Sequence, residues 1–394
     1  MKKCLFVALL CVVNSLAAQT YVWKNGHPLV VDPDSITFVK PDFSAQVTDS
    51  VTKDLYKSVN FLYLTQDYSG NPLWASAQLI LTLDQAKNKY VGKMALYNHY
   101  TISSSDDCPT CGKLDIQAGV IGSGYAVVSA DYEGFGETAD RPQAYCYGEA
   151  NARVSIDALL AAREWLVNEG YTLTDTIVNF GYSQGGQTTV AVLKLSQTEY
   201  RGKVHFMKTI AGAGPYDLIL TYKQFLKWKR VGQAAVLPLM FTTINELEHL
   251  GLDYKEVFKG KLASNVKSWI ISKKFDTNEL QDLIGQDSIK NYMQPAYIDS
   301  TNESTLKLLE LVDKYDFTNE WIPDPETDIV IVHSPQDDVV ATQNSVELYN
   351  FLKDKGVANA TLDTNTLKGT HLQAGMLFVL YVPDILNKWE KGQK

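Results

Sequence analysis

The run Gly181-Tyr182-Ser183-Gln184-Gly185 constrains the fold of this chain more than any other feature. Residues 176–178 before it are apolar, as in a buried strand, and residues 187–193 after it have the apolar spacing of a helix. A serine between two glycines at a strand–turn–helix junction indicates a very sharp turn, where side chains in place of the glycines would collide with the neighbouring strand and helix. We therefore predict that Ser183 stands at the edge of a sheet, at the positive end of a helix, where its hydroxyl can act as a nucleophile.

A serine nucleophile needs a histidine that accepts its proton and a carboxylate that orients this histidine. His371 lies in a loop between a predicted strand, residues 360–367, and a predicted terminal helix, which is where the base of such a site is expected. The predicted strand 328–332 ends at His333 and leads into a turn with two carboxylates, Asp337 and Asp338. Because this turn follows the strand, it places a carboxylate at the same edge of the sheet as Ser183. For His249 and His333 we expect no catalytic role.

Four segments together resemble a known family: residues 129–136 (SADYEGFG), 181–186 (GYSQGG), 337–340 (DDVV) and 369–371 (GTH). They are similar to motifs of the α/β-hydrolase superfamily and, more narrowly, of the secretory lipase family of fungi and bacteria. The resemblance runs from about residue 94 to the carboxyl end. It implies an α/β-hydrolase fold, and it selects as the acid the aspartate three residues before the second valine of the Asp-x-x-Val turn, which is Asp337. The predicted catalytic residues are therefore Ser183, Asp337 and His371.

An ester-cleaving site also needs two backbone N–H groups that stabilise the oxyanion. One belongs to Gln184, directly after the nucleophile. The other is expected from the loop that follows the predicted strand 90–97, and there we select Tyr100. Related hydrolases often have His-Gly in this loop, whereas this chain has His99-Tyr100. His99 is either a second functional histidine or, more commonly in such loops, a residue that positions the loop by a hydrogen bond.

Composition and the amino terminus restrict the setting in which the chain works. The 394 residues, 45% of them hydrophobic, are enough to bury a large core, and a net charge of −9 argues against nucleic acid or an anionic membrane surface as partner. Residues 1–18 have a basic start, an apolar centre and a small-residue end, as in a cleaved signal peptide, and the apolar run is too short to span a bilayer. We expect a secreted or periplasmic protein.

Three cysteines, Cys108, Cys111 and Cys146, follow the predicted signal peptide. In an oxidising compartment three cysteines are expected to give one disulfide and one free thiol, so we predict a bridge within this region. A redox role is not expected, because Cys108 and Cys111 lie on an irregular loop and not at a helix start. A zinc site would need a fourth ligand, for which His99 is the only candidate.

The expected domain organisation is a core interrupted by an insertion. Residues 19–90 begin with antiparallel strands, including a hairpin of residues 59–65 and 73–81 around Gly70-Asn71-Pro72. Strands and helices then alternate, which favours a mostly parallel sheet with helices on both faces. Residues 19–213 and 326–394 are assigned to this core, and residues 214–325, with helical spacing, to a cap or lid over the site. Five apolar residues of the insertion are candidates for lining an acyl pocket, although most of them could equally belong to the core: Phe225, Trp228, Leu239, Met240 and Phe241.

These observations favour an exported serine hydrolase that cleaves carboxylic esters through an acyl-enzyme. Its substrate would be a small-molecule or lipid ester, and we expect no metal or organic cofactor and no obligatory protein partner. An esterase acting on acetylated or feruloylated polysaccharide is one alternative, because 22 Tyr and 7 Trp could provide a sugar-stacking surface. A non-catalytic binding module on a hydrolase scaffold is another, although binding alone does not require all three of Ser, Asp and His.

Overall fold

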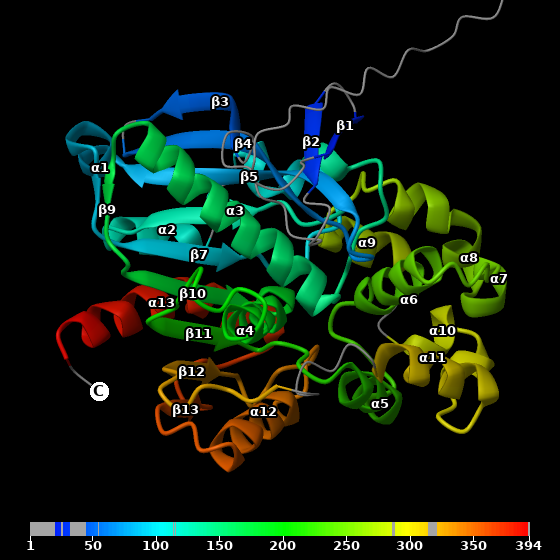
Figure 1. The fold of residues 1–394 in the computed structure, drawn as a ribbon. Helices are drawn as coiled ribbons and strands as arrows, with labels where there is room; N and C mark the ends of the chain where they lie inside the picture. Colours follow the sequence, from blue (N-terminus) through cyan, green and yellow to red (C-terminus); the bar gives the residue numbers. More distant parts are fainter. Residues whose placement is uncertain are drawn as a thin grey trace, which may run out of the picture.

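A nine-stranded sheet in the order β13-β12-β11-β10-β7-β8-β5-β4-β3 runs through the molecule (Figure 1). The computed structural model describes residues 20–24, 27–31, 45–53, 55–112, 114, 116–285, 288–313 and 321–392. The predicted signal peptide, residues 1–18, lies outside them.

The strands at one side of the sheet are antiparallel and the others are parallel, as predicted from the sequence. The antiparallel strands are β3 (Gln46–Thr52), β4 (Tyr56–Gln66) and β5 (Pro72–Thr82), and β5 joins them to the parallel part by pairing with β8. The parallel strands are β7 (Met94–Asn98), β8 (Ala126–Ala130), β10 (Ile177–Tyr182), β11 (Lys208–Gly212), β12 (Ile329–Val332) and β13 (Ala360–Asp363). Two small sheets lie apart: β1 (Thr20–Lys24) with β2 (His27–Val31), and β6 (Tyr90–Val91) with β9 (Thr172–Leu173).

Helices cover both faces of the sheet, because the parallel strands are apolar on both sides. Val127 and Val128 of β8, for example, belong to different core clusters on opposite faces. One face is covered by α3 (Gly148–Asn168), α4 (Gln184–Ser196) and α12 (Gln343–Asp354), and the other by α2 (Gln117–Gly122) and α13 (His371–Glu390). A short helix, α1 (Leu83–Asn88), follows β5.

The boundaries differ from the sequence prediction in a few places. The predicted strand 90–97 is divided into β6 and β7, because Gly92 and Lys93 interrupt the ladder. The predicted strand 360–367 ends early, as β13, at Asp363, where the Asp363 side chain accepts the N–H groups of Asn365 and Thr366 and turns the chain.

Between β11 and β12 the regular elements of the described residues are helices, and these gather beyond the ends of the strands (Figure 1). They are α5 (Leu218–Trp228), α6 (Val236–Leu247), α7 (Tyr254–Val257), α8 (Gly260–Val266), the π-helical turn Lys267–Ile271, α9 (Thr277–Ile284), α10 (Ile289–Tyr292), the 3₁₀ turn Pro295–Tyr297 and α11 (Glu303–Asp313). Their apolar side chains share one core cluster with residues 144–147 and with Val339 and Val340. The helices are therefore packed onto the loops that follow β8 and β12.

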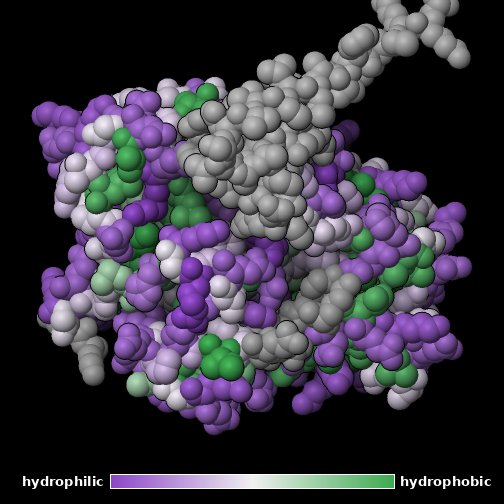
Figure 2. Space-filling model, viewed as in Figure 1, coloured by the Kyte–Doolittle hydropathy of each residue, from purple (hydrophilic) through white to green (hydrophobic). Residues whose placement is uncertain are grey.

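The surface shown in Figure 2 is mainly hydrophilic, and its hydrophobic residues form separate small patches. None of the helices in the described part of the chain combines the length and apolarity that a membrane span requires.

Candidate active site

Ser183 occupies a strained turn between β10 and α4. Its backbone has φ 58° and ψ −124°, a conformation that a residue other than glycine adopts only where the surroundings enforce it. The glycines around it are required by close packing: a Cβ at Gly181 would lie 2.6 Å from the carbonyl oxygen of Asn98, and one at Gly185 would overlap the same oxygen. The Ser183 N–H donates to the Gly212 carbonyl at 2.8 Å. The turn predicted from the sequence is therefore present, and it projects the hydroxyl beyond the end of β10.

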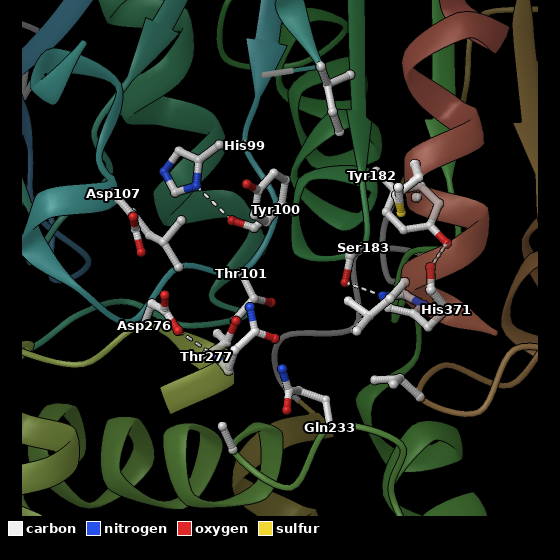
Figure 3. A pocket seen from close by; sticks show the side chains of 18 of the residues that line it. His99, Tyr100, Thr101, Asp107, Tyr182, Ser183, Gln233, Asp276, Thr277 and His371 are labelled. Atoms are coloured by element: carbon white, nitrogen blue, oxygen red, sulfur yellow. Dashed lines mark hydrogen bonds between the residues drawn. The ribbon is translucent and has the colours of Figure 1, made fainter. Parts of the chain in front are cut away.

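His371 meets Ser183 from the opposite side of the same sheet edge. Its Nε2 atom lies 2.8 Å from Ser183 Oγ (Figure 3). His371 is the first residue of α13, which Thr370 and Gln373 begin with a reciprocal capping box. The Tyr182 hydroxyl donates to the His371 carbonyl at 2.8 Å, and the two rings pack with centroids 5.1 Å apart. Strand β10 thus holds the nucleophile and also positions the imidazole.

Asp337 lies behind His371, with Oδ2 2.6 Å from His371 Nδ1. Its other oxygen, Oδ1, accepts the N–H groups of Val339 at 2.9 Å and Val340 at 2.7 Å. Burial raises the pKa of Asp337, but the charge of His371 and the hydrogen bonds from His333 and His371 outweigh it and hold the pKa below its usual range. Asp338 is exposed and accepts the His371 backbone N–H at 3.1 Å. The structure therefore brings Ser183, His371 and Asp337 into one hydrogen-bonded chain, and it places Asp338 outside this chain.

His333 also contacts the carboxylate, which the sequence analysis did not foresee. Its Nε2 atom lies 2.9 Å from the Val340 carbonyl oxygen and 3.3 Å from Asp337 Oδ2, and its Nδ1 atom lies 2.7 Å from Ser345 Oγ. Because the Val340 carbonyl can only accept, His333 donates from Nε2, and its Nδ1 atom forms a second hydrogen bond with the Ser345 hydroxyl. The only signal in the sequence was the i, i+4 spacing of His333 and Asp337 across a turn, which is too common to assign a contact.

The predicted oxyanion donors lie at the two sides of Ser183. Gln184 is the first residue of α4, and Tyr100 lines the same pocket as Ser183. His99 Nδ1 lies 2.8 Å from the Tyr100 carbonyl oxygen, and the ring stacks on Tyr132 with centroids 3.8 Å apart. Burial lowers the pKa of His99 to about 4, so the ring is neutral and its Nδ1–H can donate to this carbonyl. These contacts place His99 among loop-positioning residues, whereas the donor roles of Gln184 and Tyr100 stay predictions.

The loop after β8 connects the sheet to both neighbouring loops. The Asp131 carboxylate accepts the Ser76 hydroxyl and both the N–H and the hydroxyl of Thr110, and burial raises its pKa to about 6 although these hydrogen bonds oppose the rise. Lys273, from the helical segment between β11 and β12, donates its ammonium to the carbonyl oxygens of Gly134, Ala139 and Arg141. Residues 131–141 therefore hold the loop 101–112 and the helical segment at fixed positions around Ser183.

A pocket of about 530 Å³ opens beside Ser183 and His371, and its walls differ in polarity. The apolar lining comes mainly from α6, α13 and the residues before α2: Ile102, Ile116, Val236, Leu239, Val339, Leu372, Met376 and Val379. The polar lining comes from the loop after β7, the residues before α6 and the start of α9: Thr101, Asp107, Gln117, Gln233, Asp276, Thr277 and Asn278. Figure 3 shows Asp107, Asp276 and Thr277 across the pocket from Ser183 and His371. A ligand in this pocket meets apolar and hydrogen-bonding groups on different sides.

Only one of the five predicted lining residues lies on this pocket. Leu239 lines it, whereas Phe225, Met240 and Phe241 are buried in the core of the helical segment and Trp228 packs against that core. For these four the structure selects the core alternative. Helices α5 and α6 are apolar around much of their circumference, so apolarity alone could not tell a pocket face from a core face.

Gln233 is a pocket residue that the sequence analysis missed. Its side chain is buried and is directed into the pocket (Figure 3), and within the described part of the chain its amide has no hydrogen-bond partner. Because this amide faces the pocket, it is available to form a hydrogen bond with a polar group of a ligand. A single glutamine before an apolar run gives no sequence signal of this kind.

The predicted disulfide is not present, since Cys108, Cys111 and Cys146 are all free thiols. Cys146 packs in the core of the helical segment, away from the cluster that contains Cys108, and burial raises its pKa to about 12. Cys108 and Cys111 lie on a 3₁₀ turn and not on an irregular loop, and their Sγ atoms are 3.1 Å apart, against about 2.05 Å in a disulfide. Within the described residues, no group of three or more His, Cys, Asp or Glu is arranged to hold a metal ion.

Comparisons with known proteins agree with this arrangement. A family model described as secretory lipase matches residues 113–378. Among solved structures, the rice cell wall degrading esterase LipA of Xanthomonas oryzae in a ligand-bound form is 20% identical, with a TM-score of 0.73 over 89% of this chain and 98% of LipA. A protein of Legionella pneumophila is 19% identical, with a TM-score of 0.76 over 89% and 99% of the two chains. Candida antarctica lipase A in its closed state is 16% identical, with a TM-score of 0.61 over 90% and 86%.

These likenesses confirm the α/β-hydrolase fold predicted from the sequence. No curated protein matches the chain in sequence.

Proposed function

Because the chain belongs to the secretory lipase family, we propose that its Ser183–His371–Asp337 geometry makes it an exported serine hydrolase that cleaves carboxylic esters. The observation that carries the proposal is the continuous hydrogen-bonded chain: 2.8 Å from Ser183 Oγ to His371 Nε2 and 2.6 Å from His371 Nδ1 to Asp337 Oδ2. The order Ser, Asp, His along the sequence is the one that this fold uses.

In the proposed reaction, His371 Nε2 takes the Ser183 proton while Ser183 Oγ attacks the ester carbonyl carbon. The oxyanion accepts hydrogen bonds from the Gln184 N–H and from the loop that contains Tyr100. When the carbon–alcohol bond breaks, His371 gives its proton to the departing alcohol oxygen. Water then attacks the acyl-enzyme with His371 again as the base, and the acid is released. Asp337 orients the imidazole and stabilises its charged form.

The two walls of the pocket suggest how an ester is placed. The apolar residues of α6 and α13, such as Leu239 and Met376, suit the acyl chain. The polar wall, with the unpartnered amide of Gln233, suits a hydroxyl-bearing alcohol group such as the remainder of a partial glycerol ester. Residues 214–325 would then act as a lid over the site, with helix α6 as the part of the lid that forms a wall of the pocket.

A second candidate function, cleavage of ester side chains on polysaccharide, is favoured by the same polar wall and by the likeness to the cell wall degrading esterase LipA. The two candidates differ in the acyl group and the alcohol. A panel of triacylglycerols, nitrophenyl esters and feruloylated or acetylated sugars therefore separates them: the highest kcat/KM on sugar esters would favour the polysaccharide esterase.

Export is the remaining part of the proposal, and the secretory family supports it. We expect cleavage after residue 18, so mass spectrometry of protein recovered from outside the cytoplasm should find an amino terminus at Gln19. Recovery of the full-length chain from the cytoplasm alone would contradict it.

The mechanism is tested with a fluorophosphonate probe, which reacts with activated serines. We expect labelling of the wild-type protein and none of Ser183→Ala, together with a fall in ester hydrolysis of about 10⁴ to 10⁶. No labelling of the folded wild-type protein would instead support a binding module without catalysis. His249→Ala serves as the matched control, because His249 lies outside the hydrogen-bonded chain and should keep wild-type activity.

A further inference from the structure

Tyr132 lies in the loop after β8, within the segment 129–136 that resembles a family motif, and the proposed reaction does not use it. Its side chain is buried, and the described residues that line the pocket do not include it, so Tyr132 does not touch a substrate there. Its φ of 64° lies in the left-handed region, which is uncommon for a residue with a bulky side chain. Strained residues of this kind cluster at functional sites, so the contacts of Tyr132 indicate what it does.

The first contact of Tyr132 is with the loop that follows β7. Its ring stacks on the ring of His99, with centroids 3.8 Å apart and an angle of 28° between the planes. Its hydroxyl donates to the His99 carbonyl oxygen at 3.4 Å. Because a peptide group is planar, the orientation of this carbonyl also fixes the direction of the Tyr100 N–H, the predicted oxyanion donor. His99 Nδ1 lies 2.8 Å from the Tyr100 carbonyl oxygen, so both peptide groups of Tyr100 are held (Figure 3).

The second contact of Tyr132 is with helix α4. Its hydroxyl also forms a hydrogen bond with the side chain of Thr188. The Thr188 hydroxyl in turn donates to the carbonyl oxygen of Gln184, the first residue of α4 and the other predicted oxyanion donor, at 3.1 Å. Burial raises the pKa of Tyr132 more than these hydrogen bonds lower it, so its hydroxyl keeps the proton that it donates. The Tyr132 hydroxyl therefore lies between the two segments that carry the predicted donors.

The residues on either side of Tyr132 hold it in this conformation. On the amino side, the Asp131 carboxylate accepts the hydroxyls of Ser76 and Thr110. On the carboxyl side, the Phe135 N–H donates to the Tyr132 carbonyl oxygen at 3.2 Å. A strained backbone persists only where the surrounding contacts enforce it, and these contacts lie at both ends of the residue.

We propose that Tyr132 is a positioning residue that fixes the N–H groups of Gln184 and Tyr100 relative to each other. The inference rests on the proposed ester hydrolysis, of which it specifies how the oxyanion donors are aligned. Each donor must lie about 2.7–3.1 Å from the position of the oxyanion, so a small shift of the loop against α4 weakens the transition state more than the bound ester. This role gives the segment 129–136 a part in the reaction without contact to the substrate.

The test uses Tyr132→Phe, which keeps the stacked ring and removes the hydroxyl. We expect kcat on a soluble nitrophenyl ester to fall about tenfold while KM stays within a factor of two, because the oxyanion forms only in the transition state. The second readout is the affinity for an alkyl trifluoromethyl ketone. Ser183 Oγ adds to the carbonyl carbon of this ketone and its proton passes to His371, so the ketone oxygen becomes an oxyanion. The affinity should fall by about the same factor as kcat.

The matched control is Tyr222→Phe, which also removes a buried hydroxyl that donates to a backbone carbonyl, that of Tyr297, but in the core of the helical segment. It should keep the kcat and the ketone affinity of wild type. A second variant, Thr188→Val, removes the contact with α4 and should also lower kcat. The double variant Tyr132→Phe/Thr188→Val should lose no more than about the larger single loss, because both changes break one connection.

Unchanged kcat and ketone affinity in folded Tyr132→Phe would overturn the positioning role, and so would a rise in KM with unchanged kcat. Equal losses in Tyr222→Phe would also overturn it, since any buried hydroxyl would then have the same effect. Failure of the proposed hydrolysis is a different result: wild-type protein would then neither cleave the ester nor react with the fluorophosphonate probe.

Discussion

Replacing Asp337 by asparagine should remove activity by forcing the wrong tautomer on His371. The N–H groups of Val339 and Val340 both donate to Asp337 Oδ1, so position Oδ1 must hold an acceptor. In the variant the amide oxygen takes that position, and the amide nitrogen takes the position 2.6 Å from His371 Nδ1. An N–H donor there requires Nδ1 to accept, which puts the ring proton on Nε2, facing Ser183. His371 then cannot take the proton of the nucleophile.

The size of the effect follows from this loss of function at one atom. A triad with the wrong tautomer loses about 10⁴ in kcat, which corresponds to about 5.4 kcal/mol of transition-state stabilisation. Folding should persist, because the amide oxygen keeps both backbone hydrogen bonds. Asp338→Asn should cost less than about tenfold, because among the described residues the Asp338 carboxylate accepts only the backbone N–H of His371, at 3.1 Å, and an amide oxygen can do the same.

The assay is kcat on a soluble nitrophenyl ester for the two aspartate variants and wild type, with thermal unfolding followed by circular dichroism to show that each variant is folded. The ranking decides the assignment. If Asp338→Asn lost about 10⁴ and Asp337→Asn kept more than a tenth of the activity, Asp338 would be the acid and the tautomer argument would be refuted.

Three further predictions concern residues that the structure added to the site. His333→Phe removes a buried donor to Asp337 and leaves other polar groups unpaired, so it should lower the free energy of unfolding by about 2–4 kcal/mol and kcat by about tenfold. Urea unfolding and steady-state kinetics measure both, and unchanged values would leave His333 without a role. For Gln233→Leu we compare kcat/KM on a glycerol monoester with kcat/KM on the propyl ester of the same acid. The ratio of the first to the second should fall by about tenfold, because the variant loses one hydrogen bond to the glycerol group. An unchanged ratio would show that the alcohol group binds at another part of the pocket. Lys273→Met leaves three carbonyl oxygens of residues 134–141 without their donor and should lower the free energy of unfolding by about 2–4 kcal/mol in urea, whereas a loss below about 0.5 kcal/mol would show that water replaces the ammonium.

The sheet and the three residues at its edge were predictable because local signals and chain order agreed. Glycines around Ser183 permit only a sharp turn, and the apolar runs before Ser183 and Asp337 mark parallel strands whose carboxyl ends meet at one edge. The boundaries of β6, β7 and β13 were not predictable to the residue, since pairing partners, and not the strand's own sequence, decide where a ladder ends.

Contacts made across long stretches of sequence were beyond prediction. The local sequence does not distinguish Leu239, which lines the pocket, from Met240, which packs inside the helical segment. Both residues are apolar, and the packing of α6 against its neighbours decides which of its faces meets the pocket. The contact between His333 and Asp337 and the unpaired amide of Gln233 likewise exist only once distant segments have assembled. The predicted disulfide failed for a similar reason. Cys146 packs in the core of the helical segment, and the spacing of the cysteines along the chain does not indicate this.

Two helices begin at the reacting atoms: Ser183 caps α4, and His371 opens α13. The amino end of a helix carries a partial positive charge, which favours a nearby anion and disfavours a nearby cation by about 0.3–1 kcal/mol. The fields that assist the oxyanion therefore oppose the imidazolium that forms on His371 in the same transition state. This conflict gives Asp337 an electrostatic task besides orientation. Two backbone N–H groups and a second histidine keep the Asp337 carboxylate ionised. Its full negative charge then offsets the electrostatic cost of forming the His371 imidazolium at the positive end of a helix.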